Sequence, residues 1–189
     1  MGLLLVAAGQ GLATESSART GFSAQARAAG LSTQQATALQ AKVDDYLVTL
    51  AGRGTQISPN QIDMNGAMLN VTVPGETHPR QLVQAAKVKY QADGCHWPTG
   101  GAPSPPGYGW FCAYERESLQ GDTVSMYHCD NYEIPFRTIG GWWNNQTTGT
   151  KPVLYWENFQ APPWGMPAAP SRVTQGVKWD PVHSIKNCV

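Results

Sequence analysis

Four cysteines and the histidine beside one of them are the residues of this 189-residue chain best suited to nucleophilic or metal chemistry. Cys129 directly follows His128, and a thiol nucleophile is commonly activated by a neighbouring histidine that acts as a base. Adjacent residues of a strand point to opposite faces, however, so His128 is badly placed to activate the thiol. Zinc on Cys95, His96 and Cys112 is disfavoured, because zinc sites normally use closer, repeated ligand pairs. We therefore expect no catalytic thiol and no zinc site.

Carboxylates are the other candidates, because acid–base catalysis needs two of them brought together in a cleft. No spacing selects a pair from the six candidate carboxylates, namely Glu115, Glu117, Asp122, Asp130, Glu133 and Glu157. We expect most of them on solvated surface. The chain is predicted not to be an enzyme, and a hydrolase would lack an identifiable nucleophile or acid–base set.

The overall charge excludes partners that are recognised by a strong field. Thirteen basic and thirteen acidic side chains cancel, and charged residues make up only 14% of the chain. Binding to nucleic acid or to an anionic membrane surface is therefore not expected. The 20 glycines, 14 prolines and 7 tryptophans indicate instead a β-rich extracellular protein with rigid turns.

The N-terminal stretch and the cysteines both bear on export. Residues 1–30 contain the short apolar run "GLLLVAAG" and then small and polar residues, which indicates either a truncated signal peptide or a disordered tail. No run approaches the roughly 20 apolar residues of a transmembrane helix. All four cysteines come after position 94, and in a secreted protein an even number predicts two disulfides.

Residues 31–76 are predicted to form a small module of a helix and a β-hairpin. Ser32 and Gln35 have the spacing of a capping box, and apolar residues follow at helical spacing until Gly52. Alternating apolar residues then surround Asn65-Gly66, a strong hairpin-turn signal. Polar residues 77–94 are expected to be a linker or a short helix.

Residues 95–189 are predicted to form a second, disulfide-stapled domain of short antiparallel strands. The segments "WFCAYE", "DTVSMYHC", "GGWWNNQ", "PVLYWEN" and "VHSIKNC" are separated by turns rich in Gly, Pro and Asn, a pattern typical of a sandwich or a Greek-key barrel. The expected fold class is therefore mainly β.

The cysteine-anchored segments "WFCAYE", "MYHCDNYEIPF", "GGWWNNQTTG" and "VHSIKNC" together resemble a secreted actinobacterial peptidase-inhibitor family, the Streptomyces metalloproteinase inhibitor type. The resemblance covers about Cys95 to Cys188 and implies a βγ-crystallin-like Greek-key sandwich. It implies that Tyr114 begins a fold-back in which Gly121 takes a positive φ. It also implies the disulfide Cys95–Cys112, which leaves Cys129 to pair with Cys188.

Calcium binding is a further implication, because many βγ-crystallin domains hold Ca²⁺ at a turn of the form (N/D)-(N/D)-x-x-(S/T)-S. Asn144, Asn145 and Thr148 match that turn, whereas Gly149 stands where the last serine belongs. We expect weak binding at one site or an ordinary polar turn, and no cofactor that the protein requires.

The function implied is a secreted monomer that blocks an extracellular peptidase with a rigid loop. The inhibitor's own small reactive-loop disulfide has no counterpart here, so the proline-rich segment 159–170 is the candidate, with Phe159, Pro163, Trp164 and Met166 as contact residues. In a strand, one of Trp142 and Trp143 faces outward, so one of them is also expected to be exposed for a partner. Two alternatives stay open: a calcium-binding structural or stress protein of the cell surface, and a cell-wall or carbohydrate-binding module using tryptophans.

Overall fold

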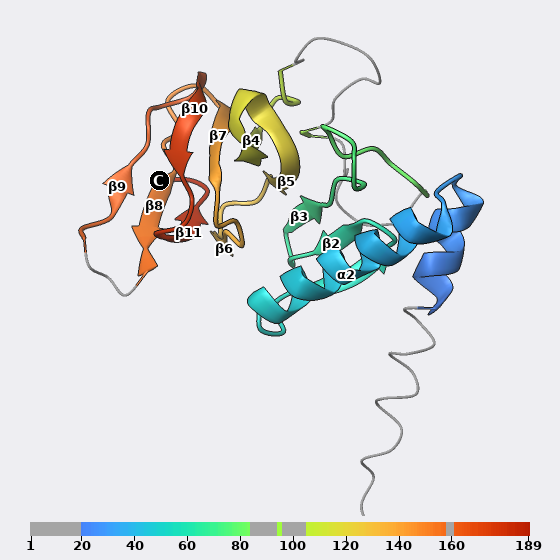
Figure 1. Ribbon diagram of the computed structural model, residues 1–189. Helices are drawn as coiled ribbons and strands as arrows, with labels where there is room; N and C mark the ends of the chain where they lie inside the picture. The colour runs from blue at the N-terminus through green and yellow to red at the C-terminus, as the bar shows by residue number, and fades with distance from the viewer. Residues whose placement is uncertain (1–19, 84–93, 96–104, 158–160) are drawn as a thin grey trace, which may run out of the picture.

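The computed structural model describes residues 20–83, 94–95, 105–157 and 161–189, and it is mainly β (Figure 1). One antiparallel sheet has seven strands in the order β1-β2-β3-β5-β4-β7-β10, and the second has four in the order β6-β11-β8-β9. The predicted fold class, mainly β with a helical segment on the N-terminal side, is confirmed. No helix among the described residues is long and apolar enough to cross a membrane.

Helix α2, Thr33–Thr49, begins and packs as its sequence predicts. The Ser32 side chain accepts a hydrogen bond from the Gln35 backbone amide, and the Gln35 side chain accepts one from the Ser32 amide. Its buried side chains, Ala36, Leu39 and Val43, recur at helical spacing on one face. A preceding helix over residues 20–28, which the sequence analysis did not predict, buries Ala26.

The predicted hairpin is present and extends the large sheet. Strands β1 (Thr55–Ser58), β2 (Gln61–Asp63) and β3 (Ala67–Asn70) follow α2, with Asn65 at φ 56° and Gly66 at φ 117° in the turn. Strand β3 then pairs with β5, where Leu69 lies opposite Val124. The N-terminal hairpin and the strands after Cys95 therefore share one continuous sheet.

The remaining strands of the large sheet are β4 (Trp110–Arg116), β5 (Gln120–Met126), β7 (Ile139–Asn145) and β10 (Ser171–Lys178). The short 3₁₀ helix η1, Glu117–Leu119, joins β4 to β5. Gly121 follows it at φ 79°, so the positive φ predicted for this fold-back is confirmed. A side chain at this position would carry a steric cost that glycine avoids.

The small sheet consists of β6 (Asn131–Glu133), β8 (Val153–Trp156), β9 (Trp164–Gly165) and β11 (Val182–Lys186). Strands β6 and β9 are too short to show an alternating pattern. Strand β10 is mostly polar and half exposed, so it lacks the apolar alternation that identifies a strand. These three strands were missed for those reasons.

Both faces of the large sheet are covered. On one face Phe111, Ala113 and Trp142 pack into a core shared with α2 and the small sheet. On the other face Cys112, Tyr114, Leu119 and Trp143 form a second buried cluster, together with Cys95 and Trp110. The central strands therefore bury successive residues rather than every second one.

Two predicted segments fall partly outside the described residues. In the predicted signal peptide or tail, residues 1–19 lie outside the described residues. In the predicted linker, residues 84–93 lie outside them. Residues 77–83 contain no helix or strand.

Candidate functional site

The proline-rich segment proposed as a contact loop lies at the edge of the small sheet. Trp164 and Gly165 form strand β9, which pairs with β8 through Leu154 and Val153. The Trp164 side chain is 45% exposed, whereas Met166 is fully buried in the core. Pro163 is exposed, and Phe159 lies outside the described residues. Of the four predicted contact residues, the structure presents Pro163 and Trp164 to solvent and uses Met166 as an anchor.

Hydrogen bonds hold this segment on both sides of Trp164. Before it, the Trp156 indole N–H donates to the Pro162 carbonyl at 3.0 Å. After it, the Met166 amide donates to the Pro152 carbonyl at 2.9 Å, and the Ala169 amide donates to the Thr150 carbonyl at 2.9 Å. The backbone around the exposed indole is thus restrained by the neighbouring chain, which lowers the entropy lost when a partner binds.

The predicted calcium turn is held by bonds of its own. The buried Asn144 amide donates to the carbonyls of Thr150 and Pro167, at 3.2 and 3.4 Å, and its Oδ1 accepts from the Gln146 amide at 3.2 Å. Asn145 donates to the Pro106 carbonyl at 2.6 Å. Thr148 is exposed. The Asn144 oxygen is therefore already used within the turn, and calcium binding here stays a prediction.

Gly149 explains the departure from the calcium-turn pattern. Its φ is +92°, with open space where a Cβ would be. Serine at that position would be strained by its backbone conformation rather than by a clash. The glycine is what this turn geometry requires.

The expectation that one tryptophan of the central pair is exposed is wrong. Trp142 is 1% exposed and stacks on Phe111 with ring centroids 5.9 Å apart, and Trp143 is 8% exposed. The two indoles do point to opposite faces, as predicted, but the second face is covered as well. The guanidinium of Arg172 lies 4.6 Å from the centroid of the Trp143 ring, a cation–π contact. Neither side chain is available as a partner surface.

The four cysteines form the two disulfides implied by the resemblance, Cys95–Cys112 and Cys129–Cys188. No free cysteine is present among the described residues. Cys95 and Cys112 are buried within the second cluster, whereas Cys129 is exposed. The cysteines therefore serve as two cross-links in the folded chain.

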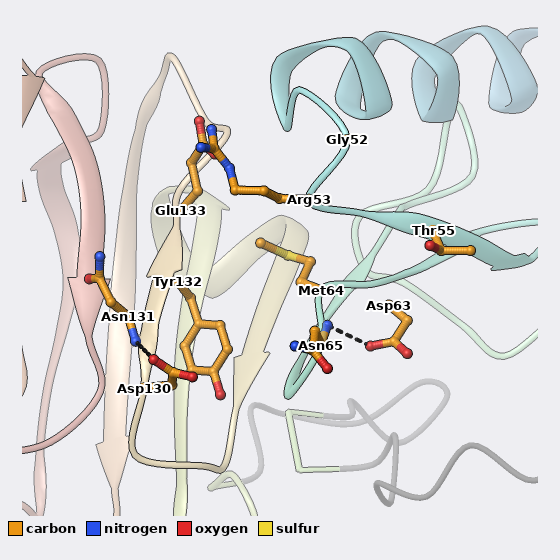
Figure 2. A pocket seen from close by; sticks show the side chains of 10 residues that line it. All are labelled: Gly52, Arg53, Thr55, Asp63, Met64, Asn65, Asp130, Asn131, Tyr132 and Glu133. Atoms are coloured by element: carbon orange, nitrogen blue, oxygen red, sulfur yellow. Dashed lines mark hydrogen bonds and ion pairs between the residues drawn. The ribbon is translucent and has the colours of Figure 1, made fainter.

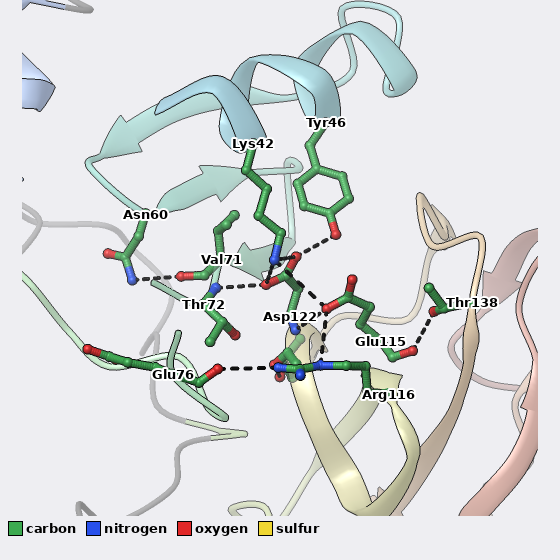
Figure 3. Close-up of polar contacts among 12 residues, drawn as sticks. Lys42, Tyr46, Asn60, Val71, Thr72, Glu76, Glu115, Arg116, Asp122 and Thr138 are labelled. Carbon is green, nitrogen blue, oxygen red and sulfur yellow. Dashed lines mark hydrogen bonds and ion pairs between the residues drawn. The ribbon is translucent and has the colours of Figure 1, made fainter. Parts of the chain in front are cut away.

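A buried carboxylate joins the N-terminal segment to the large sheet (Figure 3). Asp122 is 0% exposed and accepts hydrogen bonds from the Lys42 ammonium at 2.7 Å, the Thr72 amide at 2.7 Å and the Tyr46 hydroxyl. Burial raises the pKa of Tyr46 above its ordinary value, and the carboxylates of Asp122 and Glu115 raise that pKa further. Tyr46 consequently remains a protonated donor.

No local signal distinguishes Asp122, so the sequence predicted only that most of the six carboxylates lie on the surface. Glu115 accepts from the Asp122 amide at 3.0 Å and Glu117 accepts from the Gly176 amide at 2.9 Å. Glu157 pairs with Arg137. These three carboxylates and Asp122 thus take part in contacts that hold the fold together.

The last two carboxylates, Asp130 and Glu133, lie in a pocket that the sequence did not predict (Figure 2). Its volume is about 490 Å³, and it lies between the chain after α2, the Asn65 turn and strand β6. Glu133 forms an ion pair with Arg53 across one end. The lining residues come from three distant parts of the sequence, so no spacing could have revealed it.

The described residues contain no cluster of three or more His, Cys, Asp or Glu side chains that could hold a metal ion. Comparisons with protein-family models, curated proteins and solved structures found no match for this chain.

Proposed function

We propose that this chain is a secreted, monomeric protein-binding module that blocks an extracellular peptidase by presenting the segment around Trp164. The observation that carries the proposal is the 45% exposure of a large indole on a backbone fixed at both sides. Tryptophan is among the residues that most often dominate binding energy at protein interfaces. A restrained segment also loses little conformational freedom when it enters a cleft.

The strand order supports the same proposal. Of the four consecutive strands β4 to β7, three belong to the large sheet and the third strand, β6, belongs to the small sheet. Of the next four, β8 to β11, three belong to the small sheet and the third strand, β10, belongs to the large sheet. This exchange agrees with the βγ-crystallin-like topology that the resemblance to the inhibitor family implies. The two disulfides agree with an exported protein, because such bonds persist in oxidising compartments.

The expected mode of action follows from the chemistry of the exposed segment. Trp164 lies on β9, a short strand at the edge of the small sheet. A peptidase cleft can therefore accept the indole while a strand of the peptidase pairs with the exposed backbone of β9. Pro163 stiffens the approach from the N-terminal side by limiting φ. The peptidases expected to be blocked are those whose specificity pocket accepts a bulky aromatic side chain.

Inhibition assays test the proposal directly. Purified protein is mixed with a thermolysin-like and a subtilisin-like peptidase, and residual activity is measured with a fluorogenic peptide. We expect inhibition of at least one enzyme, and about 30-fold weaker inhibition by Trp164→Ala, the size of an interface hot spot. Tyr108→Ala is the matched control, because Tyr108 is 70% exposed at a distant point in the sequence.

Two results would overturn the proposal. One is full peptidase activity in the presence of micromolar excess of the protein. The other is equal inhibition by the wild type and Trp164→Ala, which would place the contact elsewhere. Mass spectrometry of the mixture shows whether the protein stays intact or is consumed as an ordinary substrate.

A further inference from the structure

The pocket between the Asn65 turn and strand β6 is a second candidate site. None of its lining residues belongs to the Trp164 segment. Figure 2 shows Asp130, Asn131 and Tyr132 on one wall, Asp63 and Asn65 on the other, and Met64 between them. Met64 and Tyr132 are buried, whereas Asp130 and Asn131 are exposed. The site is therefore a groove whose lining is polar at the exposed Asp130 and Asn131 and largely apolar at the buried Met64 and Tyr132.

The charges of this groove are only partly balanced. Of its three carboxylates, Glu133 is neutralised by the Arg53 guanidinium. Asp63 accepts a hydrogen bond from the Asn65 amide at 2.8 Å, and Asp130 accepts one from the Asn131 amide at 2.7 Å. Each of these bonds uses Oδ1, and no cation of the described chain forms an ion pair with either aspartate. The other carboxylate oxygen of each aspartate accepts no hydrogen bond from the described residues.

The walls are held in a fixed relation to each other. Gly66 follows Asn65 in the hairpin turn, and a Cβ on it would lie 2.6 Å from the Tyr132 hydroxyl oxygen. The turn is thus seated directly on the aromatic residue of the opposite wall. The Arg53–Glu133 ion pair connects the same two parts of the chain at the other end of the groove. A groove that is formed before binding costs less to occupy.

The lining selects the chemical class of the ligand. A volume of about 490 Å³ is within the range of small-molecule sites and far exceeds a single ion. Calcium would need six to eight oxygen ligands around one point, and no three His, Cys, Asp or Glu side chains of the described residues are grouped so that they could hold one metal ion. Two separated carboxylates that share one lining with a thioether and a phenol ring suit a cation that also has an apolar stem.

We propose that this groove binds a small organic cation, an alkylammonium or alkylguanidinium group, between the carboxylates of Asp63 and Asp130. The charged head donates hydrogen bonds to the two carboxylates, and the alkyl stem lies along Met64 and Tyr132. The Arg53–Glu133 pair closes the end of the groove and excludes a second cation there. The site is separate from the Trp164 segment, so it stands or falls independently of peptidase inhibition.

Isothermal titration calorimetry of the intact protein with agmatine, which carries both cationic groups, tests this assignment. We expect saturable one-to-one binding that weakens as salt is added, and no binding of the neutral 1,4-butanediol. Asp63→Asn with Asp130→Asn keeps the side-chain shapes and removes both charges, and we expect binding about tenfold weaker or lost. Asp180→Asn, an exposed change of the same kind elsewhere, should bind as the wild type does.

The location is tested by amide chemical-shift mapping in the same titration. Shifts should centre on Asn65, Asn131 and their neighbours, and thermal unfolding of the double variant should show that it remains folded. The assignment is overturned by an absence of binding at millimolar agmatine, by equal binding to the double variant, or by equal binding of butanediol. Displacement of agmatine by one equivalent of calcium would also overturn it, because that result defines a metal site.

Discussion

The phenol of Tyr46 on helix α2 donates a hydrogen bond to the buried carboxylate of Asp122 on strand β5, 76 residues further along the chain. Lys42, one helical turn earlier, pairs with the same carboxylate at 2.7 Å. The backbone amide of Thr72, just after β3, supplies a third donor. One carboxylate therefore fixes the helix, the hairpin and the larger sheet to each other.

Removing the charge of Asp122 should strongly destabilise the protein. In Asp122→Asn an NH2 group would replace one carboxylate oxygen that now accepts a hydrogen bond from Lys42 or Tyr46. The NH2 group would then face the Lys42 ammonium or the Tyr46 hydroxyl, which are also hydrogen-bond donors. We expect the free energy of unfolding to fall by about 3 kcal/mol, measured by urea denaturation. Asp45→Asn, on the exposed side of the same helix, should change it by less than about 0.5 kcal/mol. Equal effects of the two variants would contradict a central role for Asp122.

Stability should decline at alkaline pH because two tyrosines are buried. Burial raises the pKa of both Tyr46 and Tyr114 above the ordinary value of 10.0. Below that value the phenols are protonated in both states, so their contribution to stability is fully present. Above it, the unfolded phenols lose protons that the folded ones keep, and the free energy of unfolding falls. Urea denaturation from about pH 9 to about pH 11 measures the decline. The loss should be shallower in Tyr46→Phe, and an unchanged slope in that variant would refute the assignment.

Gly66→Ala should be more costly than a positive φ alone explains. Alanine there would meet an unfavourable φ of 117° and also approach the Tyr132 hydroxyl. We expect a loss of about 2 to 3 kcal/mol, against about 1 kcal/mol for Gly75→Ala, where φ is +94° and the space is open. Part of the difference should disappear when Gly66→Ala is made in a Tyr132→Phe background. Equal losses of stability for Gly66→Ala, for Gly75→Ala and for Gly66→Ala in the Tyr132→Phe background would show that the turn does not pack on Tyr132.

The two disulfides should differ in how readily they are reduced. Cys129 is exposed, whereas Cys95 and Cys112 are 6% and 0% exposed. Mild reductant followed by alkylation and mass spectrometry should label Cys129 and Cys188 first, since a thiolate must reach the sulfur it attacks. Replacing both cysteines of a disulfide by serine should lower the free energy of unfolding. We expect a loss of about 4 kcal/mol for Cys129–Cys188, whose cysteines are 59 residues apart, and of about 3 kcal/mol for Cys95–Cys112, whose cysteines are 17 residues apart. Simultaneous labelling of all four cysteines would argue against this order.

The features that were predicted correctly depend on residues close together in the chain. Ser32 and Gln35 are three residues apart, and their capping box satisfies backbone amides within one turn of the helix. Asn65 and Gly66 adopt positive φ values within the hairpin turn that they form. The glycine at position 121 likewise reports local backbone conformation. The disulfide pairing followed from the resemblance to a known cysteine pattern.

By itself, then, the sequence determined the mainly β class, the capped helix and the hairpin. Only the tertiary structure decided that β3 pairs with β5, that Trp143 is covered, and that Asp122 is buried among three donors. It alone also brought Asp63 and Asp130 to opposite walls of one groove. The physical reason is that local patterns set backbone conformation and the direction of alternate side chains. What covers each face, and which distant donor meets each carboxylate, depends on how non-adjacent segments pack.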